Sequence, residues 1–130
     1  MSLIENASKR IFGERMAIPA GLAAGSLPEG VQLRRGSMIP WIGGLLARMP
    51  GPALAVTLGR TIVVHPGTTL TARLLAHELI HVRQWQQDPL FPIRYTLASM
   101  RYGYWKNPYE IEARDASDAP AGTPTAENPT

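Results

Sequence analysis

Two histidines and one glutamate give this sequence its clearest chemical signal, in the segment His77-Glu78-Leu79-Ile80-His81. On a helix, side chains four residues apart project from one face about one turn apart, so His77 and His81 can bind the same metal ion. Glu78 points about 100° further round the helix axis. Its carboxylate then lies beside the metal, where it can accept a proton from bound water. The H-E-x-x-H pattern therefore predicts metal-assisted hydrolysis with Glu78 as general base.

An alternative for this segment is a core helix whose histidines only hydrogen-bond to their neighbours. The chain has three histidines, and two of them lie in this pattern. The leucines and valine around them predict a mostly buried helix. Two neutral imidazoles in apolar surroundings are costly without a partner such as a metal, so we favour a metal site.

Length and composition limit what kind of site and domain this is. A chain of 130 residues forms one small domain with a modest core. Cysteine is absent, so a metal must be held by histidine, carboxylate, carbonyl or water. We expect a single domain over residues 1–117, with the metal-site core at 53–117. Residues 118–130 lack apolar bulk and are expected to form a disordered tail.

The charge is unevenly distributed, because all 13 basic residues but only 7 of the acidic ones precede residue 115. A basic body can favour nucleic acid or anionic membranes. Most of these residues are scattered singly, which favours a solvated surface and gives no firm evidence for nucleic acid. The apolar run 38–47 is too short to span a bilayer. We therefore expect a cytoplasmic protein. Trp41, within this run, is expected to be buried, as large apolar side chains usually are.

Before the histidines, the pattern predicts four structural segments. Residues 1–16 have the spacing of a short amphipathic helix, and residues 17–37, rich in glycine and proline, are expected to form loop. Residues 38–49 are either a short helix or a loop. Residues 53–58 and 61–65 then read as a β-hairpin because of their β-branched residues and the intervening Gly59-Arg60 turn.

Three helices are expected to follow the hairpin. The first carries the histidines, is capped by Thr68 or Thr69 and ends near Gln87. The second covers residues 90–102 and is closed by Gly103. The third, at residues 108–116, is capped by Asn107. Strands followed by helices predict an α+β fold.

A zinc ion held by two histidines needs at least one more protein ligand if one position is to stay open for water. Glu110 and Glu112 are the leading candidates from the third helix. They lie about 200° apart around a helix, so we do not expect both to bind.

The segment His77-Glu78-Leu79-Ile80-His81-Val82-x-Gln84, followed by Asn107-Pro108-Tyr109-Glu110-Ile111-Glu112-Ala113, resembles the gluzincin metallopeptidases. The resemblance covers roughly residues 53–116 and is strongest to small bacterial proteins with a minimal zincin-like domain. It implies a hairpin packed on the H-E-x-x-H helix and two following helices, Zn²⁺, and a peptide or protein substrate. It also implies Glu110 as third ligand and Glu112 as the fallback. Arg114 stands where a longer form of the family run has aspartate.

Two functions remain open at this point. One is a zinc metallopeptidase. In addition to the metal, one of a small set of polar side chains would donate a hydrogen bond to the oxyanion that develops on the substrate carbonyl. The other is a non-catalytic zinc-stabilised module that binds a protein, membrane or nucleic acid, with His65 as a fourth ligand. Because the domain is small, another copy or a partner protein could complete the cleft. The candidate hydrogen-bond donors to the oxyanion are Tyr95, Tyr102, Tyr104, Arg101 and His65.

Overall fold

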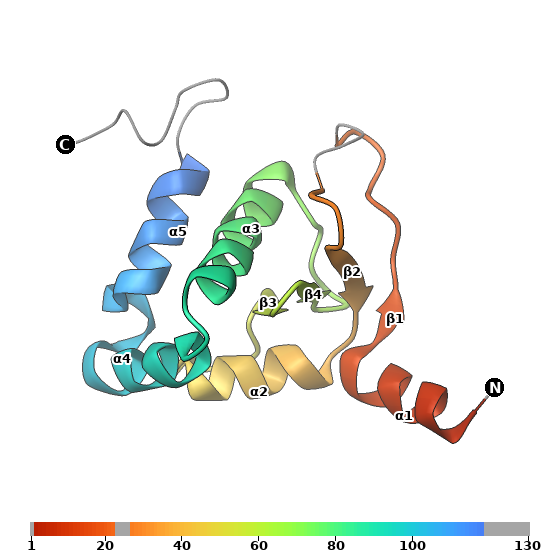
Figure 1. Ribbon diagram of the computed structural model, residues 1–130, viewed down its shortest axis with the longest axis horizontal. Coiled ribbons are helices and arrows are strands. Elements are labelled where there is room, and N and C mark those ends of the chain that lie inside the picture. Colours follow the sequence, from red (N-terminus) through yellow and green to blue (C-terminus); the bar gives the residue numbers. More distant parts are fainter. Residues whose placement is uncertain (1, 23–26, 119–130) are drawn as a thin grey trace.

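The computed structural model describes residues 2–22 and 27–118, and these form an α+β fold of five helices and one four-stranded sheet (Figure 1). The helix that carries the histidines, α3, lies above the sheet, and two further helices follow it. The elements in chain order are α1 (Leu3–Phe12), β1 (Glu14–Arg15), β2 (Gln32–Arg35), α2 (Met38–Leu46), β3 (Ala55–Leu58), β4 (Thr61–Val64), α3 (Ala72–Gln87), α4 (Phe91–Lys106) and α5 (Pro108–Asp118).

The sheet is mixed, with strand order β1-β2-β4-β3. β4 pairs in parallel with β2 and antiparallel with β3, and the hairpin register places Leu58 opposite Thr61. Gly59 has a φ of 62° in the hairpin turn, a conformation that glycine adopts without strain. Three consecutive residues of β4, 62–64, are fully buried, so this strand is covered on both faces.

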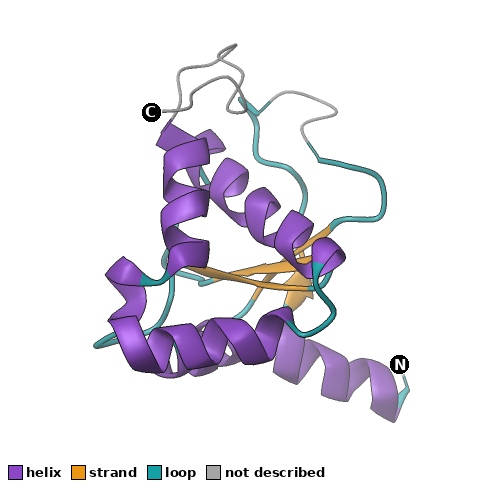
Figure 2. Ribbon diagram, turned by 60° about the vertical axis from the view of Figure 1, so that its left-hand side comes forward, coloured by secondary structure: helices purple, strands orange, loops and turns teal. Residues whose placement is uncertain are grey.

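Helices cover the two faces of the sheet differently (Figure 2). α3 packs over one face, where Leu75 and Val82 join a cluster of buried residues that includes Ile62 and Val64. α2 runs beneath the other face. Its glycines allow close approach, because a Cβ atom on Gly44 would lie 2.2 Å from the Gly51 carbonyl oxygen. α4 meets the C-terminal end of α2, where Arg48 donates to the Met100 carbonyl, and α5 packs against α3.

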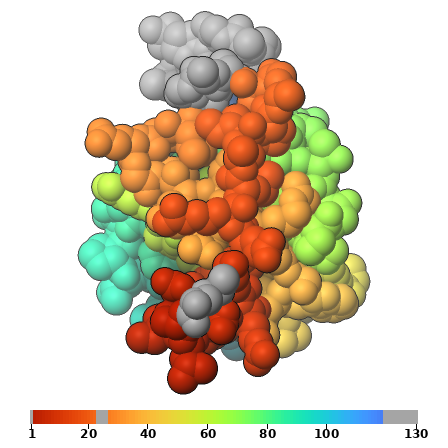
Figure 3. Space-filling view, turned by 90° about the vertical axis from the view of Figure 1, so that its right-hand side faces the viewer, coloured from red at the N-terminus to blue at the C-terminus, as the bar shows by residue number. Residues whose placement is uncertain are grey.

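The N-terminal part of the chain covers one end of the molecule (Figure 3). α1 lies at the lower end of this side and has no buried residue. Its N-cap is Ser2, whose side chain accepts a hydrogen bond from the Glu5 backbone at 3.1 Å. The predicted amphipathic helix is therefore present, but its packing contribution is small.

The hairpin and the three following helices agree closely with expectation, with one error at a helix start. Thr71 is the N-cap of α3, since its hydroxyl accepts a hydrogen bond from the Leu74 backbone at 3.1 Å. Thr68 and Thr69 were wrong predictions, because Thr68 belongs to a turn closed on the His65 carbonyl at 2.9 Å. Helical geometry in α4 is interrupted at Gly103, whose φ is 77°.

Three predictions in the first half of the chain were wrong. Residues 14–15, expected within the first helix, form β1, because Gly13 ends α1 with a φ of 82° and the two residues then pair with β2. Residues 32–35 form β2 instead of loop, because they pair along β4, a partner distant in sequence. Trp41 is exposed instead of buried, because α2 turns Ile39 and Pro40 toward the body of the molecule.

The predicted domain boundary falls at the end of the described residues. The expected tail at residues 118–130 is described only at Asp118, which belongs to the tail by expectation but is the last residue of α5; residues 119–130 lie outside the described residues. In the described part of the chain, no helix combines the length and apolar character needed to cross a membrane.

Candidate metal centre

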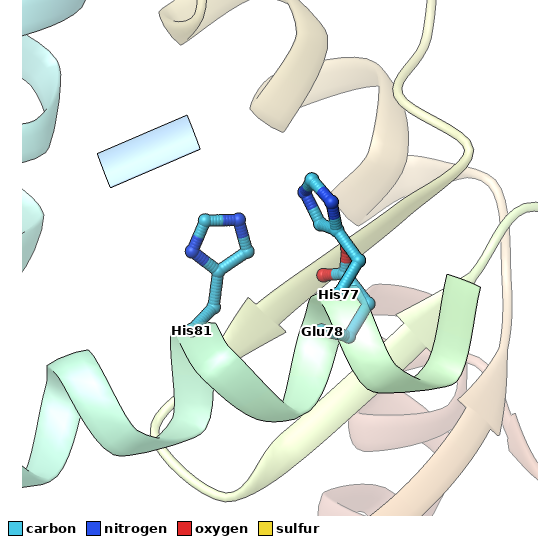
Figure 4. A group of neighbouring side chains, drawn as sticks. All are labelled: His77, Glu78 and His81. Carbon is cyan, nitrogen blue, oxygen red and sulfur yellow. The ribbon is translucent and has the colours of Figure 1, made fainter. Parts of the chain in front are cut away.

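α3 positions the two histidines and Glu78 on its side facing the other helices and β3 (Figure 4). One ligand atom from each of the three residues lies within 4.8 Å of the others. His77 and His81 stand with their ring centroids 5.0 Å apart. Glu78 and His81 are buried. Of the described residues, these three therefore form a group that could hold a metal ion.

α5 adds Glu110 to this group from a distant part of the sequence. Its Oε1 lies 2.8 Å from His77 Nε2 and 3.1 Å from His81 Nε2. The start of α5 is fixed by buried Asn107, whose Oδ1 accepts from the Tyr109 backbone at 3.0 Å. Asn107 Nδ2 also donates to Ser99 Oγ of α4 at 2.8 Å. The cap thus ties α5 to α4 and directs Glu110 toward the histidines.

The three side chains His77, His81 and Glu110 fit a zinc ion in chemical type. Two imidazole nitrogens and one carboxylate oxygen are a common catalytic zinc set that leaves a position open. With bonds of about 2.0–2.1 Å in tetrahedral geometry, neighbouring ligand atoms lie about 3.3 Å apart. The Glu110 contacts are a few tenths of an ångström shorter. A small outward shift of the side chains would accommodate the ion.

Gln84 fixes the orientation of His81. Its amide nitrogen donates to Glu112 Oε1 at 2.6 Å and to the Tyr109 carbonyl at 3.1 Å, so its amide oxygen faces His81 Nδ1 at 2.7 Å. His81 must therefore carry hydrogen on Nδ1, and its Nε2 faces Glu110. Glu112, the alternative ligand, lies behind His81 in this chain of contacts.

The electrostatics of the group favour a positive charge between the histidines and Glu110. Burial lowers the pKa of His81, but its hydrogen bond with Glu110 and the charges of Glu78 and Glu110 outweigh this and raise it to about 9. Burial also raises the pKa of Glu110, but its hydrogen bonds with His77 and His81 bring it well below the usual range. The same negative potential that retains a proton on His81 would attract a cation.

Glu78 lies between α3 and β3, where Thr57 contacts it. Thr57 Oγ1 lies 3.0 Å from Glu78 Oε1, to which it donates, and 3.2 Å from the Glu78 carbonyl oxygen. Burial raises the pKa of Glu78, although the neighbouring histidines oppose that shift. The carboxylate is therefore a stronger proton acceptor than an exposed glutamate.

A mostly apolar cleft of about 490 Å³ opens over the group, lined by parts of α2, β3, α3, α4 and α5. Its size is in the usual range for ligand sites. Hydrogen bonding alternates along the β3–β4 hairpin, so Ala55 and Thr57 direct their backbone groups to the outer edge of β3. No described strand pairs with this edge. Trp85 Nε1 donates to the Thr57 carbonyl there at 3.0 Å, which occupies part of it.

Of the five candidate hydrogen-bond donors to the oxyanion, two line the cleft. Tyr95 and Tyr104 line it, whereas Tyr102, Arg101 and His65 are not among the described residues that do. The Tyr95 hydroxyl donates to Glu110 Oε2 at 2.5 Å. Burial and the nearby Glu110 charge raise the pKa of both Tyr95 and Tyr104, which keeps these hydroxyls protonated. His65 Nδ1 instead accepts from the Gly67 backbone at 3.2 Å.

Sequence reasoning assigned no role to Thr57, Gln84 or Trp85, although all three contact the site. Gln84 is three residues after His81, a spacing that places side chains on neighbouring helix positions. That signal could have been used. Thr57 and Trp85 gave no such signal, because their contacts depend on how β3 meets α3.

Comparison with known proteins finds one family. Residues 47–89 match the eCIS core domain, where eCIS denotes extracellular contractile injection system. The match spans β3, β4 and α3, and so includes both histidines, Glu78 and Thr57, but ends before Glu110. No curated protein and no solved structure gives a significant match to the chain.

Proposed function

We propose that this chain is a zinc-dependent metallopeptidase with a zincin-like domain of the gluzincin type. The observation that carries the proposal is the position of Glu110 Oε1, within 3.1 Å of both His77 Nε2 and His81 Nε2. Glu110, a buried glutamate on α5, completes a set of ligand atoms suited to zinc. The segment matching the eCIS core domain contributes the other two ligands and Glu78.

Each residue has a distinct part in the proposed hydrolysis. Zn²⁺ held by His77, His81 and Glu110 supplies a Lewis acid that polarises a carbonyl and lowers the pKa of water. Glu78 accepts the proton from the attacking water on Oε2, because Oε1 already accepts the Thr57 hydroxyl. It then returns this proton to the leaving amine.

The cleft supports a peptide as substrate. An extended peptide can pair with the outer edge of β3 at Ala55, while its side chains enter the apolar cleft. Trp85 holds the Thr57 carbonyl, so pairing is confined to the Ala55 end of the strand. With the Tyr95 hydroxyl engaged by Glu110, we assign the second donor for the developing oxyanion to Tyr104.

The position of His65 favours this function over a non-catalytic zinc-stabilised module. A structural site has four protein ligands. His65, the candidate for the fourth, accepts a backbone hydrogen bond in the turn before α3 and does not line the cleft formed by the described residues. In the proposed function the buried carboxylate of Glu78 accepts a proton, whereas in a structural site it would be a further ligand beside His77 and His81.

The test combines metal analysis with cleavage of an internally quenched peptide library. Wild type is expected to contain one zinc per chain and to cleave members with apolar residues. Glu78→Gln should keep its zinc but lose at least about a hundredfold in kcat, the usual minimum for a lost general base. Glu29→Gln, which changes an exposed glutamate before β2, should behave as wild type.

Two results would contradict the proposal in different ways. Wild type without stoichiometric zinc, even after zinc is supplied, would remove the metal centre. If zinc-loaded wild type cleaves no library member, or cleaves the library no faster than Glu78→Gln, the metal site would stand but the catalytic function would not. That result would support the non-catalytic module.

A further inference from the structure

α2 and α4 expose apolar side chains on the same side of the molecule. Exposed fractions reach 56% for Trp41 and 76% for Leu45 on α2, and 59% for Leu97 and 63% for Met100 on α4. Large apolar side chains grouped in this way mark interaction surfaces. We call this surface the basal face and define it by Trp41, Ile42, Leu45, Ile93, Leu97 and Met100.

The packing of each helix shows that both exposed faces point away from the body. In α2 the residues Ile39 and Pro40 are buried, and the helix contacts β3 and β4, which lie above it in Figures 1 and 2. In α4 the buried residues Phe91 and Ser99 face α3 and α5, which also lie above it. The apolar residues of the basal face occupy the opposite side of each helix. They therefore form the underside of the domain.

The basal face is bordered by positive charge and no negative charge from its own helices. The chain has no Asp or Glu between Glu29 and Glu78, or between Asp88 and Glu110. Arg48, at the end of α2, donates from Nη1 to the Met100 carbonyl at 3.0 Å and so lies between the two helices. Arg94 and Arg101 flank the apolar stripe of α4. Arg94 Nε also lies 2.9 Å from Asp88 Oδ2, just before that helix.

We propose that the basal face binds the surface of a bilayer that contains anionic lipids. Helices that lie in the membrane plane place apolar and tryptophan side chains at the acyl boundary and arginines at the phosphates. α2 and α4 offer this combination where the C-terminal end of α2 meets α4. A second copy of the face would meet it with arginines on both sides, and Asp88, the carboxylate at its border, is already paired with Arg94, which favours a lipid surface over self-association.

Binding in this orientation would place the cleft next to the bilayer. Leu46 of α2 and Pro92 and Thr96 of α4 border the cleft on the side of the basal face. The proposal uses no residue of the metal centre, so it stands or falls separately from the proposed peptidase activity.

The experiment measures co-sedimentation of the full chain with vesicles of phosphatidylcholine alone or mixed with phosphatidylglycerol. Wild type is expected to bind the mixed vesicles only, and less at high salt because the attraction is screened. Leu45→Ser/Leu97→Ser should weaken binding at least about tenfold by removing apolar contacts. Arg94→Gln/Arg101→Gln should weaken it about thirtyfold, or fivefold for each charge.

Matched controls and alternative results keep the proposal testable. Ile111→Ser on α5 and Arg83→Gln on α3 make the same kinds of change on exposed residues outside the basal face and should bind as wild type. All these side chains are exposed, and circular dichroism checks that each variant is folded. Absence of binding, or equal binding to both vesicle types, would overturn the proposal. So would a dimer in sedimentation, without vesicle binding, that Leu45→Ser/Leu97→Ser disrupts.

Discussion

Thr57, in the edge strand β3, donates from its hydroxyl to Glu78 Oε1 on α3 at 3.0 Å. The contact is buried and connects the hairpin to the proposed general base. It leaves Oε2 of the same carboxylate free to exchange a proton. In the proposed function, β3 therefore acts through the Thr57 side chain as well as through the part of its outer edge near Ala55.

Replacement of Thr57 by valine should slow catalysis without removing the metal. Valine keeps the shape of threonine but loses the hydroxyl, and a hydrogen bond to a charged group contributes about 1.5–3 kcal/mol. We expect kcat to fall about tenfold or more, with zinc content unchanged. Steady-state kinetics and elemental analysis on the same preparations provide the measurement.

Thr57→Ser is the matched control, because it restores the hydroxyl while removing a methyl group. It should recover most of the lost kcat. Equal rates for wild type and Thr57→Val would show that Glu78 is positioned without this contact.

The hairpin, the histidine helix and the cap of α5 could be predicted from sequence because their signals are local. Alternating β-branched residues, a Gly-x turn and an Asn-Pro cap act within a few residues. β2 gave no such signal. Its four residues become a strand only through pairing with β4, about 30 positions away in the chain.

The same distinction applies to the candidate site. His77, Glu78 and His81 come from one helix, and their grouping follows from helical spacing. Glu110 was favoured by resemblance, whereas the helical wheel placed Glu112 nearer the face of Tyr109 and Ala113 and so favoured Glu112. How α5 packs on α3 decides which carboxylate reaches the histidines, and this packing is not encoded in the spacing of the third helix alone.

The two glutamates of α5 should affect zinc affinity to different degrees. Glu110→Gln removes the carboxylate next to both histidines, so we expect zinc affinity to fall by more than a hundredfold. This loss is larger than the usual loss on removing a residue that only hydrogen-bonds to a metal ligand. Glu112→Ala should cost about tenfold, because it acts through Gln84. Competition titration against a chromophoric chelator measures both. A larger loss in Glu112→Ala than in Glu110→Gln would exchange their roles.

Gln84 and Glu112 should act on His81 as one unit. Gln84→Ala releases His81 Nδ1 and should weaken zinc binding about tenfold to a hundredfold. Once Gln84 is absent, loss of Glu112 has no further route to His81. The double variant should therefore bind zinc about as well as Gln84→Ala alone.

This non-additivity is measured by a double-mutant cycle, with zinc affinity as the readout. Arg83→Ala, at a neighbouring exposed position of α3, serves as the control for substitution in this helix. Additive losses from Gln84→Ala and Glu112→Ala would contradict the chain of contacts from Glu112 to His81.

The close approach of α2 to the loop before β3 should make Gly44 sensitive to a single methyl group. A Cβ atom there would lie 2.2 Å from the Gly51 carbonyl oxygen, which belongs to backbone and cannot rotate away. Alanine favours helix by about 1 kcal/mol over glycine, but the overlap requires α2 to shift, at about 1–3 kcal/mol. We expect Gly44→Ala to lower the urea midpoint. Gly51→Ala, where no atom lies within 4 Å of the new Cβ, should stay within about 0.5 kcal/mol of wild type. If Gly44→Ala proved as stable as wild type, α2 would not be held closely against this loop. The cleft wall and the basal face, to both of which α2 contributes, would then not be joined by a rigidly held helix.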